Sequence, residues 1–245
     1  MPHNDTVKNE GHVGHIHPIS QMITEINAIF SELGFVFSEG PEMEFVRYNF
    51  DLLNVPKDHP SRDMQDTFYI AGDSEKVLRT HTSPVQVRYM ESHTPPIRII
   101  VPGKVFRNEA TDATHEAQFF QLEGLMVDRD VSLAHLKGTL EFFFSRFFGG
   151  DAEIRFRPTF FPFVEPGVEV DMKLEMTGNK LSGRWIEIMG AGMVHPNVLR
   201  GVNIDPDLYQ GFAFGMGIDR LAVLKYGIDD IRAMYNGDLR FVNQF

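Results

Sequence analysis

Two long apolar segments on either side of a short polar one constrain the fold of this chain more than any other feature. The first is IRIIVPGKVFRNE at 97–109, the second is QFFQLEGLMVD at 118–128, and ATDATHEA lies between them at 110–117. Both segments are rich in the β-branched and aromatic residues typical of strands. The pattern predicts an antiparallel pair of strands.

Helical periodicity appears mainly outside this strand-rich middle. Apolar residues recur at helical spacing from residue 19 to residue 33, and Gly34 is a plausible end of that helix. Ser83 as N-cap and Pro84 at the first helical position predict a helix that runs to residue 93. An antiparallel sheet flanked by helices, an α+β fold, fits this order better than a doubly wound sheet. Further helices are expected over 43–54, 131–148 and 218–227, and further strands near 35–45 (broken by Gly40 and Pro41), 67–70, 153–157, 168–174, 184–189 and 211–217.

Length and composition favour one compact domain. The chain has 245 residues, 42% of them hydrophobic, and no cysteine, so its stability must come from packing without disulfides. No stretch approaches the roughly 18 apolar residues of a membrane span. Residues 1–14 read as a flexible lead-in without a signal-peptide pattern, followed by a single domain over 15–245 in a cytoplasmic protein with no membrane partner.

The charge balance bears on the partners of the chain. The formal net charge is -11, whereas a protein that binds RNA by itself usually presents a basic face that neutralises phosphates. Any nucleic acid that this chain handles is therefore expected to be held mainly by something else.

Chemistry-bearing residues gather on the two predicted strands. Arg107 and Glu109 are two apart on the first, and Phe119, Gln121 and Glu123 alternate on the second, so each set should share one face. An Arg fork suits a phosphate, and a neighbouring carboxylate can accept from an exocyclic amine. An ordinary Arg–Glu cross-strand pair on a solvated face is the competing interpretation.

A second cluster is GMGIDR at 215–220. Small residues let a ligand approach the backbone, and Arg220 falls in the first turn of a predicted helix, where a cation opposes the helix dipole. That placement is favourable if an anion such as a triphosphate lies there. A tight strand-to-helix turn with a surface Arg explains the same letters, and a lone GxG is weak evidence.

Taken together, these strings resemble the signature motifs of class II aminoacyl-tRNA synthetases. FRNE, a loop, then His115, Phe119 and Glu123 resemble motif 2, GMGIDR resembles motif 3, and the helix 19–33 with GFVFSEGP resembles motif 1, which forms the subunit interface in that class. RTHTSPVQVR, FFPFVEPGVEVD and WIEIMGAGMVHPNVL further resemble the alpha-subunit family of bacterial-type phenylalanyl-tRNA synthetases, from about residue 15 to the end.

The resemblance implies ATP-dependent activation of L-phenylalanine and its transfer to tRNA(Phe). Arg107 and Arg220 would be the catalytic cations, holding the α-phosphate and the outer phosphates of ATP, with His115 beside the outer phosphates. Glu109 would recognise the adenine amine and Phe119 would stack on the base. Magnesium would bridge the phosphates, with Glu187 as a ligand, although that carboxylate can instead satisfy an Arg or a backbone amide.

The same resemblance assigns the amino-acid pocket. Its polar groups for the ammonium and carboxylate would be His81, Ser83, Gln121 and Glu123. Phe161 and Phe163 would meet the phenyl ring edge to face, a geometry that aromatic quadrupoles favour. Ala213 and Gly215 would leave room at the bottom. In a chain with 22 Phe, simple core packing is the alternative for FFPF.

The resemblance also implies partners. The family pairs the alpha subunit with a beta subunit, and motif 1 implies a dimer or heterotetramer. The chain opens almost where the family's tRNA-contacting helical hairpin should end, so it is either trimmed or naturally short, and with its acidic charge it is expected to bind tRNA weakly.

Other functions fit the sequence less well. HVGH at 12–15 imitates a class I synthetase signature but lacks the preceding Rossmann strand, and His12, His15 and His17 fit a mobile loop better than a metal site. No Walker string is present. A free-standing paralog that adenylates an amino acid for a non-tRNA acceptor, and a catalytically silent binding or regulatory module, remain alternatives. The intact Arg107, Glu109 and Arg220 favour an active enzyme over the silent module.

Overall fold

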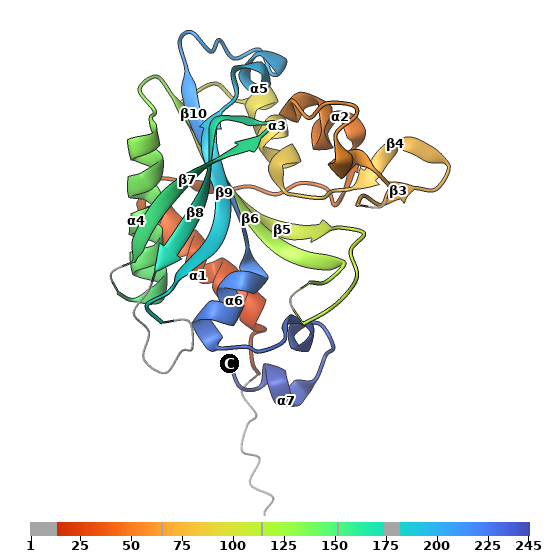
Figure 1. Ribbon diagram of the computed structural model, residues 1–245, viewed down its shortest axis with the longest axis vertical. Coiled ribbons are helices and arrows are strands. Elements are labelled where there is room, and N and C mark those ends of the chain that lie inside the picture. The colour runs from red at the N-terminus through yellow and green to blue at the C-terminus, as the bar shows by residue number, and fades with distance from the viewer. Residues whose placement is uncertain (1–13, 65, 114, 151, 174–181) are drawn as a thin grey trace, which may run out of the picture.

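A seven-stranded sheet forms the centre of the molecule (Figure 1). A computed structural model describes residues 14–64, 66–113, 115–150, 152–173 and 182–245. All neighbouring strands pair antiparallel except β1 and β5. The predicted α+β fold is confirmed, with the correction that the edge strand β1 is parallel to its neighbour. The strand order is β1 (Val36–Phe37), β5 (Ile97–Phe106), β6 (Gln118–Asp128), β10 (Gln210–Gly217), β9 (Trp185–Val194), β8 (Val164–Lys173) and β7 (Glu153–Phe161).

The predicted antiparallel pair is β5 with β6, in register from Ile97 opposite Val127 to Phe106 opposite Gln118. The strand was expected to continue through residue 109, and this is wrong. After Phe106 the Glu109 N–H bonds back to the Arg107 carbonyl at 2.9 Å, so the backbone turns there and leaves the ladder. Arg107 and Glu109 therefore lie beyond the end of β5, not on it.

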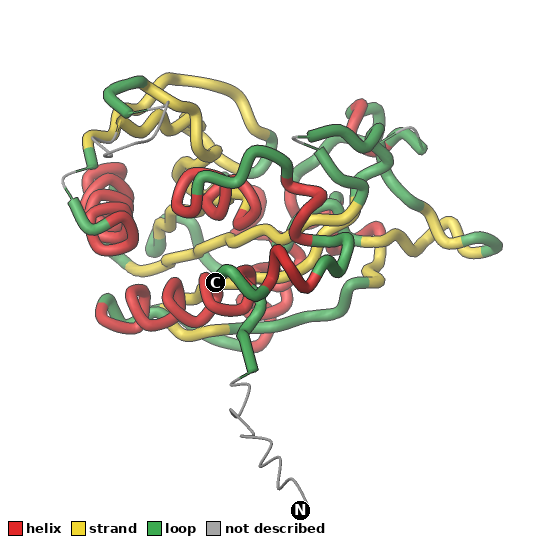
Figure 2. The backbone as a smooth tube through the Cα atoms, turned by 90° about the horizontal axis from the view of Figure 1, so that it is seen from below, coloured by secondary structure: helices red, strands yellow, loops and turns green. Residues whose placement is uncertain are grey.

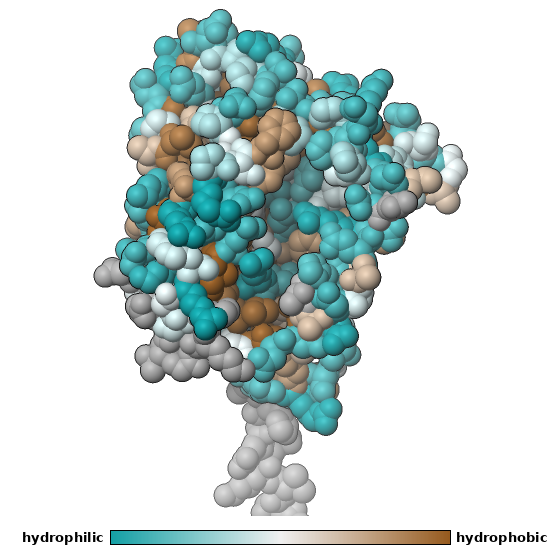
Figure 3. All heavy atoms as spheres, in the orientation of Figure 1, coloured by the Kyte–Doolittle hydropathy of each residue, from teal (hydrophilic) through white to brown (hydrophobic). Residues whose placement is uncertain are grey.

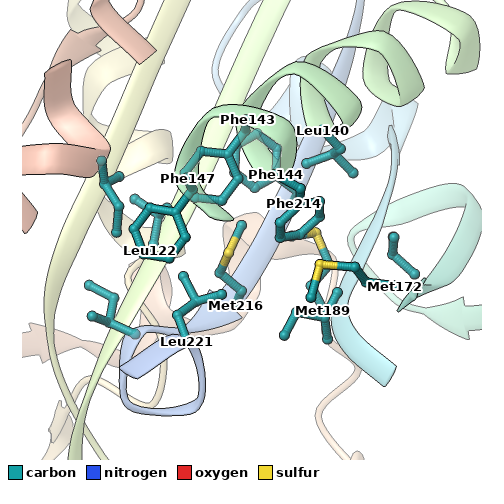
Figure 4. Close-up of a cluster of buried hydrophobic side chains, with 14 of the residues drawn as sticks. Leu122, Leu140, Phe143, Phe144, Phe147, Met172, Met189, Phe214, Met216 and Leu221 are labelled. Atoms are coloured by element: carbon teal, nitrogen blue, oxygen red, sulfur yellow. The ribbon is translucent and has the colours of Figure 1, made fainter. Parts of the chain in front are cut away.

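Three helices cover one face of the sheet: α1 (Pro18–Glu32), α4 (Leu133–Phe148) and α6 (Ile218–Tyr226). Aromatic rings join them to the strands, because the Phe30 ring stacks on Phe143 with centroids 4.8 Å apart and lies 5.5 Å from Phe214. Figure 4 shows the rings of α4 gathered against Phe214 and Met216. This buried cluster fixes β6 and β10, the two strands that matter most for the site.

The opposite face carries a second apolar cluster under α3 (Ser83–Ser92), α5 (Pro196–Gly201), α2 (Val46–Asn49) and the 3-10 helix η1 (Asp51–Leu53). A single helix over 43–54 was predicted, and this is wrong, because the chain forms strand β2 (Met43–Phe45) and then these two short turns. Ser83 is also not the N-cap. Thr82 occupies that position, and the Ser83 hydroxyl is instead bonded to Glu123.

A small second sheet projects on the right of Figure 1, with order β2, β4 (Asp73–Leu78) and β3 (Tyr69–Ile70). The strand β4 was not predicted because DSEKVL is mostly polar. The strands β7, β8 and β9 are longer than expected, since Pro158, Gly190 and Gly192 interrupt their sequence pattern but not their pairing, and β8 continues past a register shift at Pro166. The 3-10 helices η2 (Pro60–Arg62) and η3 (Ile231–Met234) and the short α7 (Leu239–Val242) complete the structure described.

The two ends of the described chain lie close together, as Figure 2 shows from below. His15 Nδ1 is 3.0 Å from the Phe245 carbonyl, and His17 bonds the Met234 carbonyl at 2.9 Å while capping α1. These contacts give both histidines a structural role. His12 and the predicted lead-in up to residue 13 lie outside the described residues. None of the helices in the described ranges has the length and apolar character needed to cross a bilayer.

Candidate active site

A cavity of about 630 Å³ lies on the second face of the sheet. Figure 3 shows a hollow on this side of the molecule, between the β7–β9 edge and the projecting small sheet. The lining comes from β6, β10 and β9 below, from α3 and the segment after β5 at the side, and from the β7–β8 turn. Ten residues predicted for the site line it: His81, Ser83, Arg107, Glu109, Gln121, Glu123, Phe161, Phe163, Ala213 and Gly215.

The pairing of β6 with β10 makes room for polar side chains over a flat floor. Glu123 lies opposite Gly215, and Gln121 lies opposite Gly217. A Cβ atom at Gly215 would approach Gln121 Nε2 and Glu123 Cγ to 3.2 Å. The glycine therefore lets two long polar side chains stand side by side on the sheet.

Glu123 is a buried carboxylate surrounded by neutral donors. It accepts from the Thr82 N–H at 3.2 Å, from Gln86 Nε2 at 2.9 Å and from the Ser83 hydroxyl. Burial raises the pKa of Glu123 to about 7, although the hydrogen bonds from Ser83 and Thr82 and the Arg107 guanidinium act in the opposite direction. A cationic group that entered the cavity would find here a carboxylate held in place for it.

Two residues that line this cavity each have a buried polar atom without a hydrogen-bond partner in the described structure: His81 Nδ1 and Gln121 Oε1. Such atoms are costly unless a ligand or water pairs with them. Burial, with the Arg107 guanidinium, lowers the pKa of His81 to about 3, so this imidazole is neutral at physiological pH. The Gln121 oxygen can accept from a ligand N–H, and neutral His81 can donate or accept.

Aromatic rings line the other part of the cavity. The rings of Phe161 and Phe163 are nearly parallel, with centroids 5.8 Å apart and an interplanar angle of 8°. Phe161 lies over Gly190, where a Cβ atom would come within 2.8 Å of the ring. An apolar recess thus adjoins the polar group around Glu123, which suits a ligand with one charged end and one aromatic end.

Arg107 enters the cavity from the segment that follows β5. Its Nε donates to the Thr80 carbonyl at 3.2 Å, and its guanidinium carbon lies 5.0 Å from the centre of the Phe119 ring. Burial lowers the pKa of Arg107, which nevertheless stays cationic at neutral pH. An oriented guanidinium beside an aromatic plate and the exposed Glu109 can bind a nucleotide.

Arg220 does not line the cavity described above. The strand order nevertheless places it at the same end of the central strands as Arg107. The strands β5 and β10 both run antiparallel to β6, so they end together where β6 begins. Arg107 directly follows β5, and Arg220 is the third residue after β10. The expected antiparallel strands are confirmed; the convergence of the two guanidinium groups on one nucleotide stays a prediction.

His115 and Glu187 lie outside the cavity. His115 is exposed in the segment between β5 and β6, where its ring contacts the Asp112 carboxylate at 3.1 Å. Glu187 accepts from Arg157 Nη2 at 3.0 Å, and Arg157 also pairs with Glu169 and Asp171. In this structure Glu187 therefore pairs with an arginine, which is the alternative to a metal ligand that the sequence left open.

Sequence reasoning missed five polar residues of the cavity: Gln86, Thr80, His59, Ser61 and Asp66. Gln86 follows Ser83 by three residues on α3, and that helical spacing is a signal that could have found it. His59, Ser61 and Asp66 lie in and beside η2, in a stretch read only as a loop. Nothing in their local sequence indicates a shared cavity, since the fold alone brings η2 to the segment after β5.

Comparison with known proteins places these features in one family. Residues 4–245 match the model of the tRNA synthetases class II core domain (F). The phenylalanine–tRNA ligase alpha subunit of Dehalococcoides mccartyi is 56% identical over 243 residues, covering 95% of this chain and 70% of the relative. That of Bacillus subtilis is 55% identical over 240 residues, covering 95% and 69%. The chain belongs to the phenylalanine–tRNA ligase alpha-subunit family.

A solved structure supports the fold of this alpha-subunit family member. Pyrrolysyl-tRNA synthetase from Desulfitobacterium hafniense superposes with a TM-score of 0.67, covering 90% of this chain and 74% of that one, at 19% sequence identity. At that identity the likeness concerns the fold alone. The recognition of the class II catalytic fold from the sequence motifs is thereby confirmed.

Proposed function

We propose that this chain activates L-phenylalanine with ATP and transfers it to tRNA(Phe), as the catalytic part of a phenylalanine–tRNA ligase alpha subunit. The observation that carries the proposal is the cavity that joins the buried Glu123 to the recess under Phe161 and Phe163. Its residues belong to a sequence 55–56% identical to alpha subunits of this ligase. A catalytic domain over 15–245 is part of the same proposal.

The amino acid would lie with its ammonium near Glu123 and the Gln121 oxygen. Ser83 and His81 would fix the carboxylate end of the ligand. Its phenyl ring would fill the recess between Ala213 and the rings of Phe161 and Phe163. The two nearly parallel rings, 5.8 Å apart, support contact through their edges with a ring placed across them. The unpartnered atoms of His81 and Gln121 would gain partners on binding.

ATP would lie near the C-terminal ends of strands β5 and β10. Arg107 would hold the α-phosphate, Phe119 would stack on adenine, Glu109 would accept from its amine, and Arg220 with His115 would hold the outer phosphates. One carboxylate oxygen of phenylalanine would attack the α-phosphorus, pyrophosphate would leave, and a phenylalanyl-adenylate anhydride would remain. A ribose hydroxyl at the 3′ end of tRNA would then attack its carbonyl carbon and release AMP. Arg107 serves this chemistry by alignment and charge stabilisation.

Class II tRNA synthetases use ATP and magnesium as a family. Among the described residues no group of three or more His, Asp or Glu side chains could hold a metal ion. Magnesium on a nucleotide usually needs only one or two carboxylates besides phosphate oxygens, and the half-exposed Glu187 side chain could supply one of them. When bound, the ion would neutralise phosphate charge.

The proposed partners are a beta subunit and tRNA(Phe), in a cytoplasmic enzyme. Support for an interface through motif 1 comes from the sheet edge, where β1 ends the seven-stranded order and Val36 is 55% exposed. The net charge of -11 agrees with a tRNA held mainly by other parts of the assembly. A particle mass equal to a single chain, measured with the beta subunit present, would contradict this assembly.

Isotope exchange between pyrophosphate and ATP tests the proposed activity. With the beta subunit present, we expect exchange that depends on added phenylalanine. No exchange under those conditions would contradict the proposed function. Exchange with another amino acid but not with phenylalanine would contradict the proposed substrate.

A further inference from the structure

Asp219 connects the start of helix α6 to strand β6. Its side chain is 4% exposed, and its Oδ2 accepts the Phe120 N–H at 2.7 Å. Asp219 is the second residue of α6, directly after the end of β10, so this bond ties the strand-to-helix turn to the neighbouring strand. Figure 1 shows α6 immediately below the end of β10.

Tyr235 completes the hydrogen bonding of this carboxylate from a distant part of the chain. Its hydroxyl donates to the other oxygen of Asp219. Tyr235 directly follows η3, whose first N–H, on Ile231, bonds the Ala113 carbonyl at 3.1 Å. The C-terminal segment therefore contacts both the first turn of α6 and the segment between β5 and β6.

Both ends of the Asp219 bridge adjoin residues of the proposed nucleotide site. Arg220 follows Asp219 in the chain, and Phe119 precedes Phe120 on β6. We propose that Tyr235 is a positioning residue for ATP, whose hydroxyl holds the Asp219 carboxylate so that Arg220 and Phe119 keep a fixed separation. This inference rests on the proposed function and adds to it a residue outside the class motifs.

The chemistry of the pair explains why one hydroxyl can matter. Burial raises the pKa of Tyr235, and Asp219 beside it acts in the same direction, so the phenol keeps its proton and donates to Asp219. Without that donor one oxygen of a buried carboxylate is left unsatisfied. The carboxylate is then free to turn away from the Phe120 N–H, and the link between the two parts of the site loosens.

Tyr235→Phe removes only the hydroxyl, and Tyr226→Phe is the matched control, because Tyr226 ends the same helix and packs on the Phe245 ring. With the beta subunit present, pyrophosphate exchange should show a KM for ATP raised at least about fivefold in Tyr235→Phe. The KM for phenylalanine and kcat should stay within twofold. Tyr226→Phe should match the wild type in all three, and thermal unfolding should show that both variants fold.

A second variant tests whether Tyr235 acts through Asp219. In the Asp219→Asn background the added Tyr235→Phe change should alter the KM for ATP by less than twofold. The inference would be overturned if Tyr235→Phe changed the KM for ATP equally in the wild-type and Asp219→Asn backgrounds. It would also be overturned if Tyr235→Phe raised the KM for ATP and the KM for phenylalanine equally. An unchanged KM for ATP in an active Tyr235→Phe enzyme would overturn it alone, whereas a wild type without phenylalanine-dependent exchange would remove the proposed function and this inference with it.

Discussion

Gln86 Nε2 donates to Glu123 Oε2 at 2.9 Å, which joins helix α3 to the middle of strand β6. Both side chains are buried, and both line the cavity. Because the donor is neutral, the carboxylate keeps its charge available for a ligand ammonium. Phenylalanine binding should therefore depend on this pair of side chains.

Gln86→Leu should weaken phenylalanine binding by removing one donor from the Glu123 carboxylate. The pKa of Glu123 should rise further above about 7, so less of the enzyme carries the charged group at neutral pH. We expect the KM for phenylalanine to rise roughly tenfold at pH 7, because the loss of one such hydrogen bond costs about 1.4 kcal/mol of binding free energy. The KM for ATP should not change, and the exposed Gln210→Leu is the control. A defect that did not shrink at pH 8.5 would contradict this explanation.

Glu123→Gln separates stability from function. A carboxyl whose pKa is raised in the folded state, from 4.5 to about 7, binds more protons there than in the unfolded chain. The free energy of unfolding of the wild type therefore falls as pH rises through that window. The variant should lack this fall and gain on the order of 1 to 3 kcal/mol relative to wild type at pH 8, while losing phenylalanine activation. Denaturant titrations at pH 5 and pH 8 measure the free energy of unfolding of the wild type and of Glu123→Gln. An equal change in both proteins between the two pH values would contradict the burial of charge at Glu123.

Arg107→Ala should slow the activation step without unfolding the protein. Loss of one transition-state donor is expected to cost on the order of 3 kcal/mol, seen as a fall in kcat for pyrophosphate exchange. Arg129→Ala, which removes an Arg positioned over Tyr209, is the control. A rate within twofold of wild type would remove Arg107 from the mechanism.

Ala213→Gly should widen the ring recess. Ala213 pairs with Gly192 and Leu125 on the floor of the sheet, next to the aromatic part of the cavity. Removal of its methyl group should admit para-substituted phenylalanines, because an apolar pocket discriminates mainly by size. Exchange assays with phenylalanine and a para-halogenated analogue compare the two enzymes. Equal discrimination before and after the change would place the recess elsewhere.

The sequence was sufficient for the core of the fold, and its motifs for ten of the residues that line the cavity. The strands β5 and β6 could be predicted because apolar residues fill both, and the polar residues on β6 follow from a period of two. The strand β4 could not, since its polar side chains on a small projecting sheet leave no apolar pattern. The early end of β5 was missed because the turn at Glu109 depends on backbone bonds that its letters do not signal. His59, Ser61 and Asp66 reach the cavity only through tertiary packing, whereas the helical spacing of Gln86 from Ser83 could have indicated its place.

A crystal structure with a non-hydrolysable phenylalanyl-adenylate analogue tests the central claim most directly. We predict the ring beside Phe161 and Phe163, the ammonium at Glu123 and Gln121, and the adenine on Phe119 with Arg107 against its phosphate. An analogue bound elsewhere, or one bound here with Arg107 turned away from the phosphate, would contradict the account.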